Sequence, residues 1–209
     1  EVFPIGCNYD EFAERADAAE QTQALSNLHD GIGDYQILLG VDRLDYTKGL
    51  IQRFKGLERA LEKYPSLREK VVLYQLVVPS RESVREYREL KGELDQLIGR
   101  IDGRFSTSEW QPTHYRYRSV APDELSALYR YATAGVVTSL CDGLNLVSKE
   151  YCASQVDETG ALVLSEFAGA ADQMAADALT INPYDVEAVA DALYEAVTLE
   201  RDERVDRMR

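Results

Sequence analysis

The chain has 209 residues, of which 45% are hydrophobic, and 23 basic against 37 acidic side chains give it a formal net charge of −14. The length suits one large domain or two small ones, and the apolar fraction is sufficient for a folded core, so wholesale disorder is excluded. The acidic balance argues against nonspecific nucleic-acid binding and docking on anionic membranes, and the longest apolar runs are strand-sized, so no transmembrane helix is expected.

Short apolar runs alternate with longer amphipathic stretches along the chain. The run YQILLGV at 35–41 is typical of a buried strand, and the stretch Leu50–Lys63 carries its apolar residues on one helical face. Strands are predicted over residues 35–41, 71–78, 135–139, 162–165 and 179–181, with an extended aromatic segment at 110–120. Helices are predicted over residues 10–28, 50–63, 83–103, 122–132, 146–155, 169–176 and 186–199, with a helix-prone charged tail after Leu199.

This alternation predicts an α/β fold, a doubly wound parallel sheet with helices on both faces. A break is expected at Gly31 and Gly33, and the mixed-sign charges of the 83–103 helix are expected on a solvated face. The opening residues EVFPIG resemble the end of a strand already in progress, and the charged tail stops abruptly. Both ends favour a chain that is part of a larger protein. The sheet core is predicted to include Ile37, Leu39, Val72 and Val136.

Cysteine and histidine usage limits the chemistry. The three cysteines, Cys7, Cys141 and Cys152, have no zinc or redox spacing, so a disulfide framework is not expected. No signal-peptide pattern opens the chain, and we therefore expect a reducing, cytoplasmic location. The only histidines, His29 and His114, are far apart in sequence, which disfavours a catalytic triad or a histidine-rich metal site.

Ligands of an open parallel sheet bind beyond the carboxyl ends of its strands, so the loops at 42–49, 79–83 and 139–145 are the candidate sites. In the first loop, Arg43 and Lys48 flank a tight turn, and Gly49 precedes a helix. Two cations at the start of a helix suit a phosphate or diphosphate. In a chain of net charge −14, such a local cluster of cations is a stronger sign of an anion site than it would be in a basic chain. The alternative is that Arg43 pairs with a neighbouring aspartate and that Lys48 is an ordinary surface lysine.

Three other interpretations of this region are disfavoured. The order Thr47-Lys48-Gly49 and the lack of leading glycines exclude a Walker loop. The pair Gly31-x-Gly33 precedes its strand and has no third glycine, so it is not a dinucleotide fingerprint. Asp42-x-x-Asp45 has basic neighbours on both sides, which disfavours a metal pair.

The third loop begins the helix predicted at 146–155. Gly143 allows close approach of the backbone to a ligand, and Asn145 is a suitable cap whose helix presents free N–H groups to an anion. Asp142 can accept hydrogen bonds from sugar hydroxyls, and Glu150 can receive both hydroxyls of a ribose. The alternative is an ordinary Asp-Gly turn with Glu150 as a solvated helix residue.

Six segments form a combined pattern: GVDRLDYTKGL at 40–50, VVPSRESVREYREL at 77–90, SLCDGLNLVSKEY at 139–151, FPIG at 3–6, SEFAGAA at 165–171 and NPYD at 182–185. Together they closely resemble the trehalose-6-phosphate synthase family. The resemblance extends over nearly the whole chain but only the second half of such an enzyme. It implies a GT-B fold of two Rossmann-like domains, with residues 1–209 as the nucleotide-sugar (donor) domain and the amino-terminal acceptor domain outside this chain.

The resemblance implies a role for each matched residue. Arg43 and Lys48 correspond to the catalytic pair that contacts the donor diphosphate, and Glu150 corresponds to the residue that binds the ribose hydroxyls. Arg81 resembles a cleft arginine that reaches the phosphate of the acceptor sugar. Asp142 with the backbone of 143–147 resembles the cradle for donor glucose and phosphates, and the backbone of Val120 would meet the base. The donor-binding set is Arg43, Lys48, Val120, Asp142, Gly143, Leu144, Asn145, Leu146, Val147, Ser148, Lys149 and Glu150.

The implied reaction is transfer of glucose from UDP-glucose to glucose 6-phosphate with retention of configuration, through front-face departure and attack, without a cofactor or essential metal. The implied partners are a nucleotide sugar and a sugar phosphate, with no nucleic acid or membrane, and a homo-oligomer of the intact enzyme stays open. ADP- or GDP-glucose as donor, glycerol 3-phosphate or another acceptor, and a non-catalytic sugar-phosphate-sensing relative are the alternatives. The isolated chain is expected to fold but to be inactive alone.

Three positions depart from the family pattern. Cys141 stands where the family often has arginine, so a cation beside the site is lost. Leu144 and Ser148 are mild changes. We expect the change at Cys141 to affect ligand affinity more than the fold.

Overall fold

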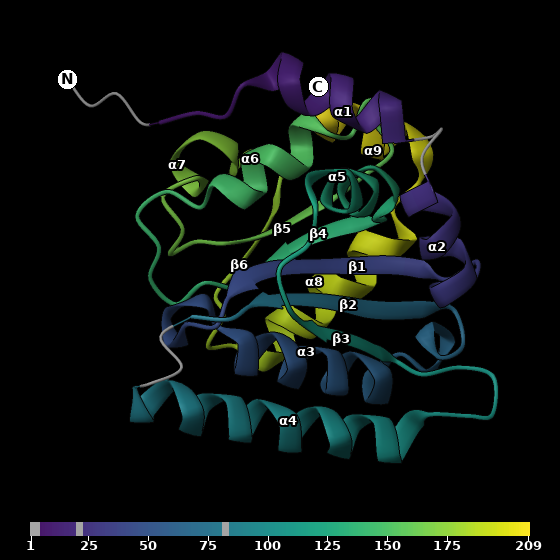
Figure 1. Cartoon of the computed structure of the whole chain (residues 1–209), viewed down its shortest axis with the longest axis vertical. Helices are drawn as coiled ribbons and strands as arrows, with labels where there is room; N and C mark the ends of the chain where they lie inside the picture. The colour runs from purple at the N-terminus through teal and green to yellow at the C-terminus, as the bar shows by residue number, and fades with distance from the viewer. Residues whose placement is uncertain (1–4, 20–22, 81–83) are drawn as a thin grey trace.

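The computed structural model describes residues 5–19, 23–80 and 84–209 (Figure 1). Its centre is a six-stranded sheet in which every paired neighbour is parallel, in the order β3-β2-β1-β4-β5-β6. The strands are β1 (Gln36–Arg43), β2 (Val71–Val78), β3 (Thr113–Tyr117), β4 (Ala134–Val137), β5 (Leu162–Ser165) and β6 (Leu179–Ile181). This strand order confirms the predicted doubly wound fold.

Helices cover both faces of the sheet (Figure 1). On one face α3 packs against α4 and α8, and on the other face α5 packs against α1, α2 and α6. These helices are α1 (Tyr9–Ala19), α2 (Gln23–Ile32), α3 (Leu50–Lys63), α4 (Arg85–Phe105), α5 (Pro122–Tyr131), α6 (Leu146–Ala153) and α8 (Val186–Thr198). The short α7 (Ala171–Met174) lies between β5 and β6, and α9 (Arg201–Met208) follows α8. No helix in the described parts of the chain is long and apolar enough to span a membrane.

The sequence prediction is confirmed for most elements and wrong at the amino-terminal end. The helix predicted over 10–28 is two helices, because α1 ends at Ala19 and α2 begins at Gln23, with residues 20–22 outside the described part. Residues 5–8 have no regular structure, and residues 1–4 are outside the described part, so no described residue supports the predicted strand end. The predicted break falls at Gly33, whose φ of 77° ends α2, whereas Gly31 lies within that helix.

The buried strands form the core together with the apolar faces of the helices. All four predicted core residues are buried, and β2 is buried along seven of its eight residues because helices cover both of its faces. The aromatic segment at 110–120 contains the short β3, and Trp110 before it is buried with its indole N–H donating to the carbonyl of Val71 at 3.0 Å.

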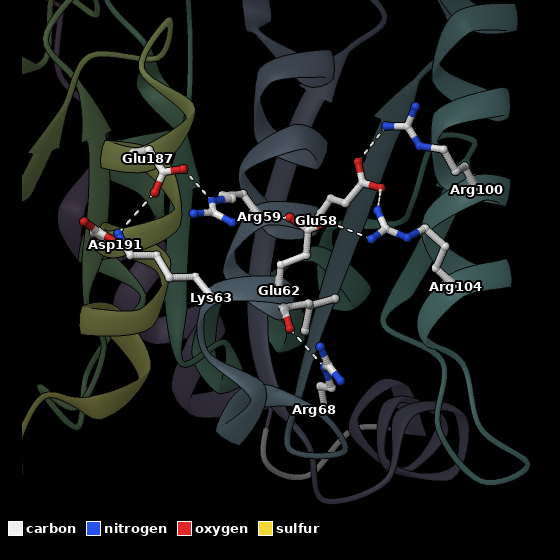
Figure 2. Close-up of polar contacts among 10 residues, drawn as sticks. Glu58, Arg59, Glu62, Lys63, Arg68, Arg100, Arg104, Glu187 and Asp191 are labelled. Atoms are coloured by element: carbon white, nitrogen blue, oxygen red, sulfur yellow. Dashed lines mark hydrogen bonds and ion pairs between the residues drawn. The ribbon is translucent and has the colours of Figure 1, made fainter.

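Helix α3 is connected by ion pairs to the helices on both of its sides (Figure 2). Toward α8, Lys63 pairs with Asp191 at 2.6 Å, and Arg59 pairs with Glu187. Toward α4, Glu58 pairs with Arg100 at 2.6 Å and also with Arg104. The charges of α4 are largely solvated, as predicted, but these two arginines also reach its neighbour. Most of these side chains are exposed, so the network contributes orientation more than stability.

A different ion pair lies inside the sheet layer. The side chain of Arg53, on α3, is fully buried, and its Nη1 donates to Asp42 Oδ2 at 2.5 Å and to Gln75 Oε1 at 2.6 Å. Gln75 Nε2 in turn donates to Asp42 Oδ2 at 3.2 Å. Gly40 provides the space, because a Cβ there would be 2.3 Å from Arg53 Nη1. This Arg53 triangle (Arg53, Asp42 and Gln75) joins α3 to β1 and β2.

Replacing Arg53 by methionine should strongly destabilise the fold. The variant keeps an apolar chain of similar length but leaves the Asp42 carboxylate buried without its cation, which costs about 3–5 kcal/mol of unfolding free energy. Urea unfolding measures the change. The matched control is Arg59→Met on the exposed face of the same helix, which should stay close to the parent. Equal unfolding curves for both variants would contradict the assignment.

Candidate functional site

The candidate site lies where β1 and β4 are neighbours. The crossover after β1 uses α3 on one face of the sheet, and the crossover after β4 uses α6 on the other. The two loops that follow these strands therefore diverge at the carboxyl ends, where open α/β sheets bind ligands, and we call the region between the two loops the crevice. The loops are joined by a backbone hydrogen bond of 2.7 Å from Leu140 N to Thr47 O. Two of the three loops singled out from the sequence are thereby brought together.

The loop after β1 is a tight turn. Asp45 Oδ1 accepts hydrogen bonds from Thr47 N at 2.9 Å and from Thr47 Oγ1 at 2.8 Å, and it caps the 3₁₀ helix η1 (Tyr46–Lys48). Gly49 follows with a φ of 64°, and a Cβ there would be 1.8 Å from the carbonyl oxygen of Thr138. Only glycine fits this position, so the turn places Lys48 at the start of α3 beside the loop after β4.

Lys48 forms the central ion pair of the site. Its Nζ donates to Asp142 Oδ2 at 2.6 Å, and the two side chains are 17% and 11% exposed. Asn145 Nδ2 donates to the same oxygen at 3.0 Å. Burial alone would raise the pKa of Asp142, but the hydrogen bonds from Lys48 and Asn145 outweigh it and lower that pKa below its ordinary value. Asp142 is therefore a carboxylate at neutral pH, and Lys48 is not an ordinary surface lysine.

Arg43 ends β1 with an exposed side chain. The alternative in which it pairs with a neighbouring aspartate is wrong, because Asp42 binds Arg53 and Asp45 binds Thr47. Within the described ranges, no residue forms an ion pair with Arg43. The two aspartates have different partners, and no group of three side chains that could hold a metal ion occurs in the part of the chain that the structure describes. The guanidinium is available to an anion at the crevice.

The start of α6 has the predicted cap. Asn145 adopts a φ of 60°, its Oδ1 accepts from Ser148 N at 3.0 Å, and Ser148 Oγ donates back to Asn145 O at 2.7 Å. The amides of Leu146 and Val147 are in the first turn, where a helix has no intrahelical partner for them. A dipole end with free N–H groups thus lies beside the Lys48–Asp142 pair, and it favours an anion there.

The loop after β5 forms backbone hydrogen bonds with Asp142 in the loop that precedes α6. Gly169 N donates to Asp142 O at 2.8 Å, and Asp142 N donates to Phe167 O at 3.1 Å. A Cβ on Gly169 would be 2.0 Å from the carbonyl oxygen of Gly143, whereas a Cβ on Gly143 meets no atom within 4 Å. The space beside the Cα of Gly143 is therefore open, whereas its carbonyl oxygen packs against Gly169.

Glu150 lies further along α6 and is half-buried. Its Oε2 accepts a hydrogen bond of 2.9 Å from the hydroxyl of Tyr129 on α5, so it is not the freely solvated residue of the alternative interpretation. The Lys149 Nζ instead donates to Ile5 O at 3.2 Å and to Gln173 Oε1 at 2.6 Å. Val120 is half-buried just before α5, at the same edge of the sheet. Arg81 lies outside the described residues.

Sequence reasoning missed three contributors to this site. Gly40 inside a buried strand signals a close approach of another group, which is the guanidinium of Arg53. Arg53 falls on the apolar side of α3, a place where a cation needs a partner. Tyr129 had no such signal, because a buried tyrosine on an apolar helix face has the pattern of a core aromatic. The exposed Cys141 and the other two cysteines are free thiols.

The model of Glycosyltransferase family 20 matches residues 1–209. The chain belongs to glycosyltransferase family 20. The alpha,alpha-trehalose-phosphate synthase [UDP-forming] A of Dictyostelium discoideum is 40% identical over 206 residues, which are 99% of this chain and 28% of that protein. The bifunctional trehalose-6-phosphate synthase/phosphatase of Thermoproteus tenax is 40% identical over 208 residues, 100% of this chain and 28% of that protein.

Solved structures of trehalose-phosphate synthases have the same fold. The alpha,alpha-trehalose-phosphate synthase of Burkholderia xenovorans in complex with glucose-6-phosphate superposes with a TM-score of 0.97 at 40% identity, over 100% of this chain and 46% of that one. An E. coli trehalose-6-phosphate structure bound with UDP-2-fluoro glucose gives 0.94 at 40% identity over the same shares. The chain thus has the Rossmann-like fold of a GT-B domain and spans less than half the length of these relatives.

The Asp142 carboxylate should stabilise this family 20 fold only while it is charged. Its pKa is lower in the folded state, so its contribution is complete well above pH 3.8, the ordinary value, and is lost as the pH falls through 3.8 and below. The unfolding midpoint of the parent should exceed that of Asp142→Asn at pH 7, and the difference should shrink toward zero at acid pH. Thermal unfolding across this pH range measures it. A difference that persists unchanged at pH 3 would contradict the assignment.

Replacement by alanine should lower the stability of the fold at Gly169 but not at Gly143. Gly169→Ala forces a Cβ against the Gly143 carbonyl and should destabilise the fold by about 1–3 kcal/mol, as overpacking does. Gly143→Ala has free space and should keep the parental unfolding midpoint. Calorimetric melting of both variants tests this, and a larger loss at Gly143 than at Gly169 would show that the turn is packed differently.

Proposed function

We propose that this chain is the donor-binding domain of a retaining glucosyltransferase that transfers glucose from UDP-glucose to glucose 6-phosphate and forms trehalose 6-phosphate. The observation that carries the proposal is the Lys48–Asp142 ion pair beside the start of α6, with Arg43 exposed at the end of the neighbouring strand β1. The relatives named as UDP-forming trehalose-phosphate synthases support the same reaction. We also assign it to the cytoplasm, in keeping with its three free thiols.

The donor diphosphate would bind between the Arg43 guanidinium, the Lys48 ammonium and the amides at the start of α6. Lys48 already faces the carboxylate of Asp142, so a phosphate oxygen meets a cation whose position is fixed before the donor arrives. The charge on the diphosphate grows as the glycosidic bond breaks, and fixed positive groups stabilise it more in the transition state than in the ground state. The leaving group then departs from the face that the acceptor attacks, which retains the configuration.

The remaining contacts position the donor. Asp142 would accept hydrogen bonds from hydroxyls of the glucose, with Gly143 open to the sugar. Glu150 would bind the ribose, and the backbone of Val120 would meet the base. Leu144, Leu146 and Val147 supply backbone to the same cradle. This set forms one side of a cleft only.

The acceptor would bind mainly to an amino-terminal domain, because the relatives are more than twice as long as this chain. Arg81 is proposed to reach the phosphate of glucose 6-phosphate. Catalysis by two domains requires both to hold donor and acceptor in register, so the isolated chain should bind UDP-glucose without turnover. Titration calorimetry of the chain with UDP-glucose, ADP-glucose and GDP-glucose tests donor binding and identifies the base. No binding of any of the three would refute the proposal.

Lys48→Ala in the intact enzyme should lower kcat by about two to three orders of magnitude, the size of the effect of losing one preorganised electrostatic donor. Arg43→Lys should also reduce kcat, because an ammonium cannot form the bidentate contact of a guanidinium with the diphosphate. Steady-state release of UDP in the presence of glucose 6-phosphate measures both.

The matched control is Lys55→Ala, which removes an exposed lysine of α3 away from the crevice and should keep the parental kcat. The unfolding midpoint of each variant separates lost chemistry from lost folding. A folded Lys48→Ala enzyme with normal kcat would show that the diphosphate binds at another loop.

A further inference from the structure

The hydroxyl of Tyr129 donates a partly buried hydrogen bond to the carboxylate of Glu150, the residue proposed to bind the ribose. This hydrogen bond joins α5 to α6 at 2.9 Å. We propose that Tyr129 is a positioning residue that orients the Glu150 carboxylate toward the ribose hydroxyls of the nucleotide. The inference rests on the proposed function, since it concerns the residue assigned to the ribose there.

Tyr129 is held in one place by its surroundings. Its side chain is 1% exposed, and its ring lies with Val41, Gly135, Val147 and Tyr151 around one small internal cavity between the sheet and α6. A tyrosine has only two side-chain torsions, and a buried ring whose hydroxyl is hydrogen-bonded has little freedom to change rotamer. The hydroxyl oxygen is therefore a fixed point at the end of a rigid ring.

The direction of the hydrogen bond follows from the charges. Burial, with the nearby Glu150 charge adding to it, raises the pKa of Tyr129 above its ordinary value, so the phenol stays protonated and donates. Glu150 Oε2 is the acceptor. No described residue donates to the other oxygen, Oε1. One carboxylate oxygen is thus occupied, and the second is available to a hydroxyl donor such as a ribose.

Without this contact the Glu150 side chain would have several rotamers, because it is half-buried on a helix and has no other side-chain partner among the described residues. Ordering such a side chain during binding costs free energy, and a preformed orientation removes that cost. The same hydrogen bond fixes α6 to α5, and Val120 lies two residues before the first residue of α5. Glu150, proposed to bind the ribose, and Val120, proposed to contact the base, are thereby held in a fixed position relative to each other.

Tyr129→Phe removes the hydroxyl and keeps the ring. The test is calorimetric titration of the chain with UDP and with UDP that lacks both ribose hydroxyls. The parent should prefer UDP by about tenfold or more, as expected for a site that hydrogen-bonds a hydroxyl. In Tyr129→Phe, the Kd for UDP should rise by about three- to tenfold, the effect of one hydrogen bond to a charged group. The Kd for the dideoxy compound should stay the same, so the preference shrinks.

Tyr151→Phe is the matched control. Tyr151 is equally buried and follows Glu150 on α6, but its hydroxyl donates to the backbone carbonyl of Ala132 at 3.2 Å. It should lower the unfolding midpoint without changing the preference for UDP. This ratio of two affinities is a readout that a merely structural role of Tyr129 would not change.

The outcomes separate the inference from the proposed function. A parent that prefers UDP, with the same preference in a folded Tyr129→Phe, overturns the positioning role and leaves the proposed function intact. A parent that binds both compounds equally overturns the ribose role of Glu150, and the inference with it. A parent that binds neither compound overturns the proposed function itself.

Discussion

The Arg53 triangle is the constraint on which the site depends. A buried arginine needs acceptors within the layer between α3 and the sheet, and the end of β1 and the middle of β2 provide them for Nη1 of Arg53. This requirement fixes Gly40 as glycine and holds Asp42 inward. Because neighbouring residues of a strand point to opposite faces, Arg43 is directed away from that buried cluster. The loop that contains Arg43 and Lys48 therefore follows directly after Asp42, whose side chain is held by Arg53.

The order of elements could be predicted from the sequence because a parallel sheet buries its strands on both faces. Val71–Val78 is an apolar run interrupted only by Gln75 for that reason, and helix α3 has a clear apolar stripe. The division between α1 and α2 could not be predicted, since both halves have helical spacing. The two helices pack differently, because α1 contacts mainly α5 and α6 and α2 contacts mainly α5.

The parts of the site that follow from a local sequence pattern could be predicted. The parts that depend on contacts between residues far apart in the sequence could not. Two cations near a glycine at a helix start, and Asn145 as a cap, are local patterns that the structure confirms as geometry. The Lys48–Asp142 pair joins residues 94 positions apart, and the Tyr129 contact joins two helices. Such contacts follow from the order of the strands in the sheet. A single sequence does not show which side chains this order brings together. Arg81 stays a prediction.

The pairing of β1 with β4 has a consequence for how the molecule folds. The two strands meet through Leu38 opposite Ala134 and Leu39 opposite Gly135, and β2 and β3 with their helices lie between them in sequence. Local units such as β1-α3-β2 close over short loops, whereas the β1–β4 contact needs closure of a much longer one, which is slower. The crevice lies at this β1–β4 contact. A chain that has paired β1, β2 and β3 alone still has no crevice, so ligand binding would report that β4 has joined the sheet.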